Sequence, residues 1–190
     1  MEVRSTLFKE VFLLKSKIRK DHRGSFSEQY HRLNLLKETG IEIDFIQDNI
    51  THSKKGVLRG LHYQLYPYTQ SKLVSVIEGT ILDVVVDIRK GSPTFGKYFT
   101  QELSDQNHLQ LFIPKGFAHG YITLSKTSIF HYKVDNYYRP KSEGSIAPND
   151  PDLGIDWGLP EKEWILSDKD KKHPKLKDAF LFDYKRNLYV

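Results

Sequence analysis

Short apolar runs rich in β-branched and aromatic residues, separated by turn signals, recur along much of this chain and are typical of β-strands. The clearest run is residues 81–88, which is rich in β-branched side chains and stops at the turn sequence Lys90-Gly91-Ser92-Pro93. Similar short runs predict strands at 74–77, 96–103, 108–113, 121–124 and 128–134. Strands at this spacing, with no helix between them, favour an antiparallel sandwich or barrel.

One segment looks helical. Residues Leu33 to Thr39 are polar on one side and are followed by Gly40, a helix-ending residue. After Tyr138 the chain is repeatedly interrupted by proline, which breaks regular structure. We therefore expect a single domain over 1–190, with its core at about 20–140 and a segment at 141–190 that wraps it with loops and short helices.

Composition narrows the possible functions. The 190 residues include no cysteine, which excludes disulfides, thiolate nucleophiles and cysteine-type zinc sites. The net charge of +5 comes from scattered lysines and arginines, which indicates a solvated, mildly basic surface, and a small anionic ligand accounts for it at least as well as a nucleic acid. No segment reaches the ~18–20 apolar residues of a membrane span, and residues 1–16 do not form a secretion signal. We expect a cytoplasmic protein with neither nucleic-acid nor membrane partners.

Two segments resemble the paired motifs of the cupin superfamily, whose barrels bind a metal through three histidines and a glutamate. The first motif is matched at Gly56, His62 and Gly79, and the second at Pro114, Gly116 and His119. In the first motif, however, Gln64 stands in the place of a ligand histidine and Lys72 in the place of the glutamate. A charged ammonium cannot ligate a divalent metal and repels it at close range.

The cupin resemblance therefore implies a double-stranded β-helix, or jelly-roll barrel, with no metal and no cofactor. Its pocket would keep two imidazoles and gain a positive charge. That combination suits a reaction in which negative charge develops on an oxygen.

Longer matches are more specific. The chain resembles the dTDP-4-dehydrorhamnose 3,5-epimerase family over roughly residues 20 to 175. The matching segments are Asp21-x-Arg23-Gly24-x-Phe26-x-Glu28, Gln47-Asp48-Asn49, Gly56 to Gln64, Lys72, Pro114 to Gly120, Tyr132, Tyr137-Tyr138, Asn149-Asp150-Pro151 and Leu166 to Asp170. The resemblance implies inversion of C3 and C5 in a deoxythymidine-diphosphate 4-keto-6-deoxyhexose, here dTDP-4-dehydro-6-deoxyglucose, to give dTDP-4-dehydrorhamnose.

The family's chemistry assigns roles to four residues. His62 resembles the base that removes a proton next to the C4 ketone, since an imidazole titrates near neutral pH. Asp170 resembles the carboxylate that orients it. Tyr132 resembles the acid on the opposite face of the sugar, and Lys72, helped by His119, resembles the stabiliser of the enolate oxygen.

The resemblance also implies the contacts to the substrate. Arg59 and Arg23 resemble diphosphate or sugar ligands, because arginine offers bidentate geometry to phosphate, and Tyr138 resembles the surface on which thymine stacks. The further predicted contacts are Phe26, Glu28, Gln47, Asp48, Asn49, Glu143 and Lys169. In the family the strands around residues 23–28 reach the neighbouring subunit's site, which implies a homodimer.

Three alternatives remain open. The first is an epimerase that acts on one carbon only or on another nucleotide 4-keto sugar. The second is a cupin that binds a nucleotide sugar without turning it over. The third is a metal-dependent cupin, against which Gln64 and Lys72 argue.

We assign structural or surface roles to the other histidines, which are His22, His31, His52, His108, His131 and His173. We assign packing roles to Trp157 and Trp164.

Overall fold

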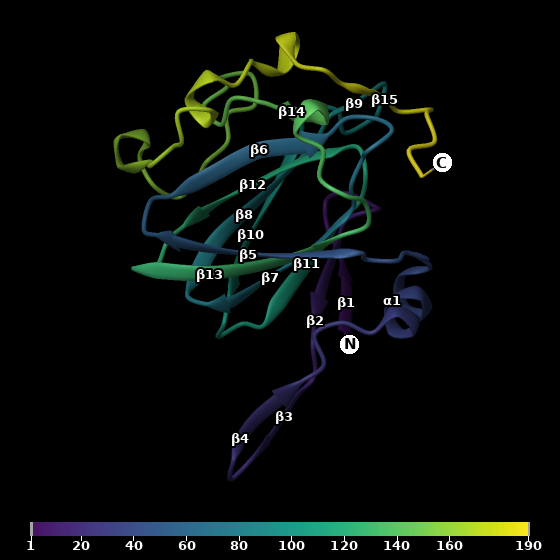
Figure 1. Cartoon of the computed structure of the whole chain (residues 1–190), viewed down its shortest axis with the longest axis vertical. Coiled ribbons are helices and arrows are strands. Elements are labelled where there is room, and N and C mark those ends of the chain that lie inside the picture. The colour runs from purple at the N-terminus through teal and green to yellow at the C-terminus, as the bar shows by residue number, and fades with distance from the viewer. Residues whose placement is uncertain (1, 190) are drawn as a thin grey trace.

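Two antiparallel sheets face one another in the computed structural model, which describes residues 2–189 (Figure 1). The six-stranded sheet runs in the order β1 (Glu2–Ser5), β2 (Phe12–Lys15), β11 (Leu109–Ile113), β7 (Lys72–Glu78), β13 (Thr127–Val134) and β5 (Gln47–Lys54). The five-stranded sheet runs β10 (Tyr98–Ser104), β8 (Thr80–Asp87), β12 (Phe117–Thr123), β6 (Leu58–Gln64) and β14 (Glu143–Ser145). Every strand predicted from the sequence is present, and the mainly β barrel is confirmed.

The barrel extends beyond the predicted core at both ends of the chain. Strands β1 and β2 belong to the six-stranded sheet, and β14 pairs with β6. The described part of the structure therefore builds the two sheets from 2 to 145 rather than from about 20 to 140. The two terminal residues of the predicted domain, 1 and 190, lie outside the described residues.

The core lies between the two sheets. Alternation along the strands turns Val74, Val85, Leu103, Leu111 and Phe130 inward, and all five are fully or almost fully buried. Burying such side chains stabilises the fold by roughly 1.5–3 kcal/mol each. Phe130 belongs both to this core and to the lining of a cavity between the sheets.

The C-terminal segment covers the outer face of the five-stranded sheet (Figure 1). It carries the short 3-10 helices η1 (Pro140–Ser142), η2 (Glu161–Glu163), η3 (Asp170–Lys172) and η4 (Leu176–Asp178). Trp157 is 1% exposed and its indole N–H donates to the Pro148 carbonyl at 2.9 Å. Trp164 packs edge-on against it. Both tryptophans therefore have the packing role that we predicted.

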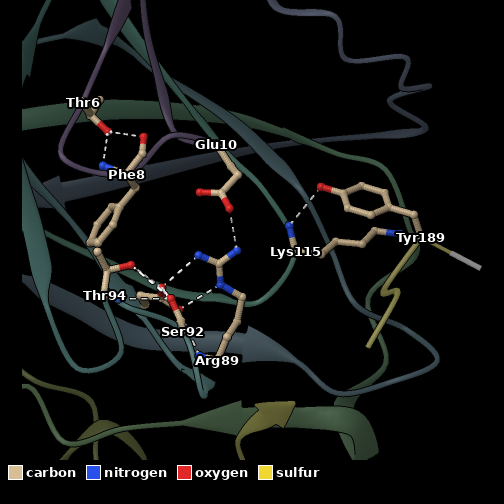
Figure 2. Close-up of polar contacts among 9 residues, drawn as sticks. Thr6, Phe8, Glu10, Arg89, Ser92, Thr94, Lys115 and Tyr189 are labelled. Atoms are coloured by element: carbon tan, nitrogen blue, oxygen red, sulfur yellow. Dashed lines mark hydrogen bonds and ion pairs between the residues drawn. The ribbon is translucent and has the colours of Figure 1, made fainter. Parts of the chain in front are cut away.

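The last residues of the chain fasten the rim of the barrel. Strand β15 (Phe182–Asp183) pairs in parallel with β9 (Arg89–Lys90). Figure 2 shows Arg89 between Glu10 and the turn that holds Ser92 and Thr94, and Tyr189 beside Lys115. The Tyr189 hydroxyl also accepts a hydrogen bond from Ser71, the residue before β7. The tail thus fixes the start of β7, the strand that begins with Lys72.

Two elements lie outside the barrel. Helix α1 (Arg32–Thr39) ends at Gly40, whose φ of 73° is the left-handed conformation that glycine adopts at helix ends. It is the single α-helix among residues 2–189, and its Leu35 packs with Leu14 and Phe112 on the outer face of the six-stranded sheet. The hairpin of β3 (Ile18–Asp21) and β4 (Gly24–Ser27) projects away from the body of the molecule (Figure 1). No helix among the described residues is long and apolar enough to cross a membrane.

Candidate active site

A cavity of about 340 Å³ lies between the sheets. Its lining combines charged groups with aromatic rings, which gives a pocket able to hold both a polar sugar and a flat base. Among the predicted site residues, the cavity is lined by Arg59, His62, Lys72, His119, Tyr132, Tyr138, Glu143, Lys169 and Asp170. These come from both sheets and from the C-terminal segment, so the complete fold is needed to assemble them.

A β-bulge places two of these residues on the same face of β6. His62 pairs with His119 and Arg59 pairs with Tyr121, so two residues of β6 lie opposite one residue of β12. Residues three apart on a regular strand face opposite sides, but the extra residue brings both Arg59 and His62 to the cavity. The bulge includes Gly60, where an added Cβ would lie 2.5 Å from the Cα of the facing glycine of β12.

His62 is hydrogen-bonded to Asp170. Its Nε2 lies 2.9 Å from Oδ1 of the carboxylate, which η3 carries across the mouth of the cavity. The His62 side chain is 30% exposed and that of Asp170 is 7% exposed. Burial raises the pKa of Asp170, but the hydrogen bond and the positive potential of the neighbouring imidazoles outweigh it, so the pKa is lowered overall. Because a carboxylate only accepts, Nε2–H donates and Nδ1 of His62 carries the lone pair.

Lys72 brings a positive charge to the same cavity. Burial lowers the pKa of Lys72 to about 8, although Asp83 and Glu143 stabilise its charge. Asp83 is fully buried and its Oδ2 lies 2.8 Å from Nε2 of His119. Burial lowers the pKa of His119 as well, despite the attraction of Asp83. The result is a cation and a neutral imidazole that share one buried carboxylate.

Tyr132 reaches the cavity from the six-stranded sheet. Strict alternation on β13 turns Phe130 and Tyr132 inward and His131 outward, one of the two arrangements that the sequence allowed. The ring of Tyr132 packs beside that of Phe130, with centroids 5.7 Å apart. Burial raises the pKa of Tyr132, so its hydroxyl keeps its proton at neutral pH.

Glu143 joins the remaining polar groups at the cavity mouth. Its Oε2 accepts a hydrogen bond of 2.6 Å from the Tyr138 hydroxyl, and its Oε1 accepts one of 2.5 Å from the Lys169 ammonium. The hydrogen bond to Glu143, with a smaller effect of burial, raises the pKa of Tyr138 to about 12. The same Oε1 lies 3.9 Å from Nε2 of His62, so this network borders the His62–Asp170 pair.

Other predicted substrate contacts lie at the edge of the cavity or away from it. Gln47 and Asn49 are hydrogen-bonded to each other on β5, and the Gln47 side chain also accepts from the backbone N–H of Tyr138. Asp48 lies between them in sequence but points to the opposite face, where it binds Lys133 at 2.7 Å and His131 at 3.1 Å. The structure therefore separates Asp48 from the cavity, because neighbouring strand residues face opposite sides.

The hairpin residues are also remote from the cavity of their own chain. Arg23 pairs with Asp21 in an exposed salt bridge, and Glu28 accepts a hydrogen bond from Asn34. Phe26 is 68% exposed. Within one chain, these three predicted contacts have no access to the cavity described above.

Several cavity residues were not identified from the sequence. They are Thr51, Tyr63, Gln70, Tyr121, Phe130 and Ser167, with Asp83 behind them. One signal was available: Asp83 interrupts the apolar run 81–88 at a position that alternation turns inward, and a buried carboxylate needs a partner. The sequence assignment of His173 to a structural or surface role also misses its place, since its Nε2 lies 3.3 Å from Oδ1 of Asp170.

The cupin metal positions contain two histidines, an amide and an ammonium, a donor set that does not fit a divalent cation. A different trio, His62, Asp170 and His173, has ligand atoms within 4.8 Å of one another. Its closest contact is the hydrogen bond between His62 and Asp170, which already accounts for the grouping.

Comparison with known proteins agrees with this geometry. A family model described as dTDP-4-dehydrorhamnose 3,5-epimerase matches residues 5–178. The chain belongs to the dTDP-4-dehydrorhamnose 3,5-epimerase family. It is therefore an isomerase, and the resemblance seen in its sequence is confirmed.

Relatives of this family align along nearly the whole chain. The dTDP-4-dehydrorhamnose 3,5-epimerase of Salmonella typhimurium is 47% identical over 184 residues, which cover 95% of this chain and 98% of the relative. A similar solved structure is that of the Legionella pneumophila dTDP-6-deoxy-D-glucose-3,5-epimerase in complex with dTDP-4-keto-L-rhamnose. Its sequence is 45% identical to this chain, its TM-score is 0.93, and the match covers 97% of this chain and 99% of that one.

A third similar structure is a 3'-monoepimerase from Streptomyces bikiniensis in complex with dTDP-quinovose. It is 32% identical, with a TM-score of 0.82, over 88% of this chain and 84% of that one. The cupin-type barrel expected from the sequence is thus confirmed for this chain.

Proposed function

We propose that the protein epimerises C3 and C5 of dTDP-4-dehydro-6-deoxyglucose to give dTDP-4-dehydrorhamnose, through an enolate at each step. The observation that carries this proposal is the cavity itself. It contains an imidazole bound to a buried carboxylate, a cation of lowered pKa and a protonated phenol. The family assignment supports the same reaction.

His62 acts as the base. Hydrogens at C3 and C5 are acidified by the C4 ketone between them, and Nδ1 of His62 has the lone pair to remove one. Asp170 fixes this tautomer and stabilises the imidazolium that forms. The electron pair of the broken C–H bond moves into the C–C bond, and the carbonyl electrons move to the C4 oxygen.

Lys72 stabilises the enolate oxygen. Its ammonium is already in place and poorly solvated, so little reorganisation is needed when negative charge develops. His119 donates Nε2–H to Asp83 and is neutral, which leaves only a lone pair on its other nitrogen. We therefore assign the enolate to Lys72, and to His119 a role in holding the Asp83 charge beside it.

Tyr132 acts as the acid. Its proton adds to the face of the sugar opposite to the one from which His62 removed it, which inverts the carbon. The phenolate is then reprotonated from solvent, and the imidazolium of His62 returns its proton to water. Each cycle therefore exchanges one sugar hydrogen with the solvent.

The nucleotide is held at the cavity mouth and by a second subunit. Arg59 and Lys169 supply positive charge for the diphosphate, and Tyr138 an exposed ring for thymine. The projecting β3–β4 hairpin carries Arg23, Phe26 and Glu28, none of which reaches its own cavity. We infer a homodimer in which this hairpin completes the partner's site.

The reaction needs neither metal nor cofactor, since the base, the cation and the acid are side chains. We also place the protein in the cytoplasm, in keeping with the absence of cysteine and with a nucleotide-sugar substrate.

Hydrogen exchange tests the proposal. The protein is incubated with dTDP-4-dehydro-6-deoxyglucose in heavy water, and C3 and C5 are followed by NMR in wild type, His62→Ala and Tyr132→Phe. His52→Ala and Tyr137→Phe are matched controls, because both of these residues are exposed and lie outside the cavity lining. Deuterium at both carbons, lost in His62→Ala and kept in the controls, is the expected result.

Other outcomes separate the alternatives. Deuterium at a single carbon would make the protein a monoepimerase, the activity named for the Streptomyces bikiniensis relative. Tight binding with no exchange at either carbon would refute the epimerase proposal and favour a nucleotide-sugar-binding protein. Activity lost on chelation and restored by a metal would refute the metal-free mechanism. A monomeric mass by light scattering would refute the shared site.

A further inference from the structure

His173 lies against the catalytic pair, yet the mechanism above does not use it. It follows η3 directly in sequence, and its side chain is 3% exposed. Its ring stands edge-on to that of His62, with centroids 5.1 Å apart and planes at 75°. A titratable ring buried at this position needs a physical reason.

The reason lies in the carboxylate of Asp170. One oxygen, Oδ1, lies 2.9 Å from Nε2 of His62 and 3.3 Å from Nε2 of His173. Neither ring nitrogen of His173 has a well-oriented hydrogen-bond partner among residues 2–189. Leaving such a group unsatisfied costs about 1–3 kcal/mol, and Oδ1 of Asp170, which Nε2 approaches to 3.3 Å without hydrogen-bond geometry, is the acceptor that would satisfy it after a small rotation of the ring.

We propose that His173 is a positioning residue, which holds the Asp170 carboxylate against His62 and sets how much of its negative charge His62 receives. The proposal deepens the proposed function and rests on it. In this proposal His173 affects the reaction through Asp170 and does not contact the sugar.

The surroundings keep His173 neutral. Burial lowers the pKa of His173, and a protonated His62 lowers it further, while Asp170, the backbone of Ile146 and Glu143 act in the opposite direction. Lys169, bound to Glu143, partly cancels the charge of that glutamate. A neutral His173 adds no charge beside the carboxylate, and its Nε2 is near enough to Oδ1, at 3.3 Å, for a small rotation of the ring to direct Nε2–H at that oxygen.

Removing the His173 N–H donor should shift the pH dependence of the reaction in a predictable direction. The carboxylate charge would then act on His62 alone and would stabilise its imidazolium. His62 would hold its proton to higher pH, and the acid limb of the pH profile of kcat/KM would move upward. The freed carboxylate would also lose orientation, which lowers kcat more than it raises KM.

Three variants test this. His173→Phe keeps a buried ring without a donor, His173→Leu is a smaller apolar alternative, and His173→Gln keeps a neutral donor that cannot ionise. We expect the apolar variants to lower kcat about tenfold, as is typical when a residue that orients a functional side chain is removed. KM should stay within about twofold, and the acid limb should move to higher pH. His173→Gln should restore both.

Thermal unfolding confirms that each variant is folded. Wild-type kcat and an unmoved acid limb in a folded apolar variant would overturn the proposal. An equal loss in the apolar and glutamine variants with an unchanged pH profile would also overturn it, since that result describes packing alone.

An NMR titration of the His62 ring separates this proposal from the proposed function, because it needs no turnover. The pKa of His62 should be higher in His173→Phe than in wild type, and an unchanged titration overturns the coupling. Failure of the wild-type protein to exchange hydrogen would refute the epimerase reaction and leave this titration as valid as before.

Discussion

Replacing Lys72 by methionine should make the protein more stable and almost inactive. A fall in pKa from 10.5 to about 8 on folding corresponds to about 3 kcal/mol of unfavourable free energy at neutral pH. Because the side chain lies at an open cavity, water screens part of this cost, and we expect a gain of about 1–3 kcal/mol in the methionine variant. Loss of the enolate-stabilising charge should lower kcat about 10²- to 10³-fold.

The pH dependence gives the sharper test. Between pH 8 and 10.5 the unfolded chain binds a proton at Lys72 that the folded protein has released, so rising pH removes the cost. Urea unfolding of both proteins should therefore show an advantage of Lys72→Met near pH 7 that shrinks toward pH 10.5. The kcat of wild type should fall as pH rises through about 8.

Lys54→Met serves as the control, since Lys54 is an exposed residue on β5. Its effect on stability should be small and flat with pH. The reasoning is refuted if Lys72→Met is less stable than wild type near pH 7, or if the difference between them does not change with pH.

Three further predictions address the surroundings of the site. Asp83→Asn removes a charge that raises the pKa of Lys72, so the basic limb of the pH profile of kcat should move to lower pH; an unmoved limb would show that the two groups are not coupled. Gly60→Ala places a Cβ against the backbone of β12, at a residue whose φ of 139° already disfavours a side chain. It should lower the free energy of unfolding by about 3 kcal/mol or more, which a lower Tm would show. An unchanged Tm would contradict the close approach. Arg89→Ala leaves the fully buried Asp87 without its cation and should lower the free energy of unfolding, measured in urea, by about 3–5 kcal/mol. A loss under about 1 kcal/mol would show that the hydroxyl partners of Asp87 satisfy it alone.

The strands that the sequence predicts are those with apolar inward faces. Residues 81–88 are buried on both faces and form a nearly continuous apolar run, and residues 128–134 alternate against the packed core, so both strands are visible in the sequence. Strand β5 (Gln47–Lys54) carries no such signal. Its inward residue Thr51 lines the polar cavity and its outward residues are largely exposed, so the strand is mostly polar on both faces. A strand that lines a site is therefore harder to predict than one that lines a core.

The site residues, like the strands, could be predicted from the sequence only in part. His62, Lys72 and Tyr132 were predicted as site residues by resemblance, and the structure brings them into one cavity. Asp48 was included because it lies in a contiguous matching segment, but contiguous strand residues face opposite sides. His173 and Asp83 act through other residues, and only the fold brings them to those partners. Local sequence carries no record of contacts that span 36 residues, as between Asp83 and His119.

The two altered cupin positions have separate roles in this barrel. Gln64 is 4% exposed, and its Oε1 accepts a hydrogen bond of 2.8 Å from the backbone N–H of Arg139. This bond ties the loop after β13 to β6 and so holds Tyr138 beside the cavity. An amide suits this position because it accepts from a backbone N–H without adding a charge to the cavity. Lys72, at the other position, supplies the charge that a metal would otherwise contribute. The same inward-facing positions thus serve acid–base chemistry, because one fastens a loop, the other provides a cation, and His62 is left free to carry a proton.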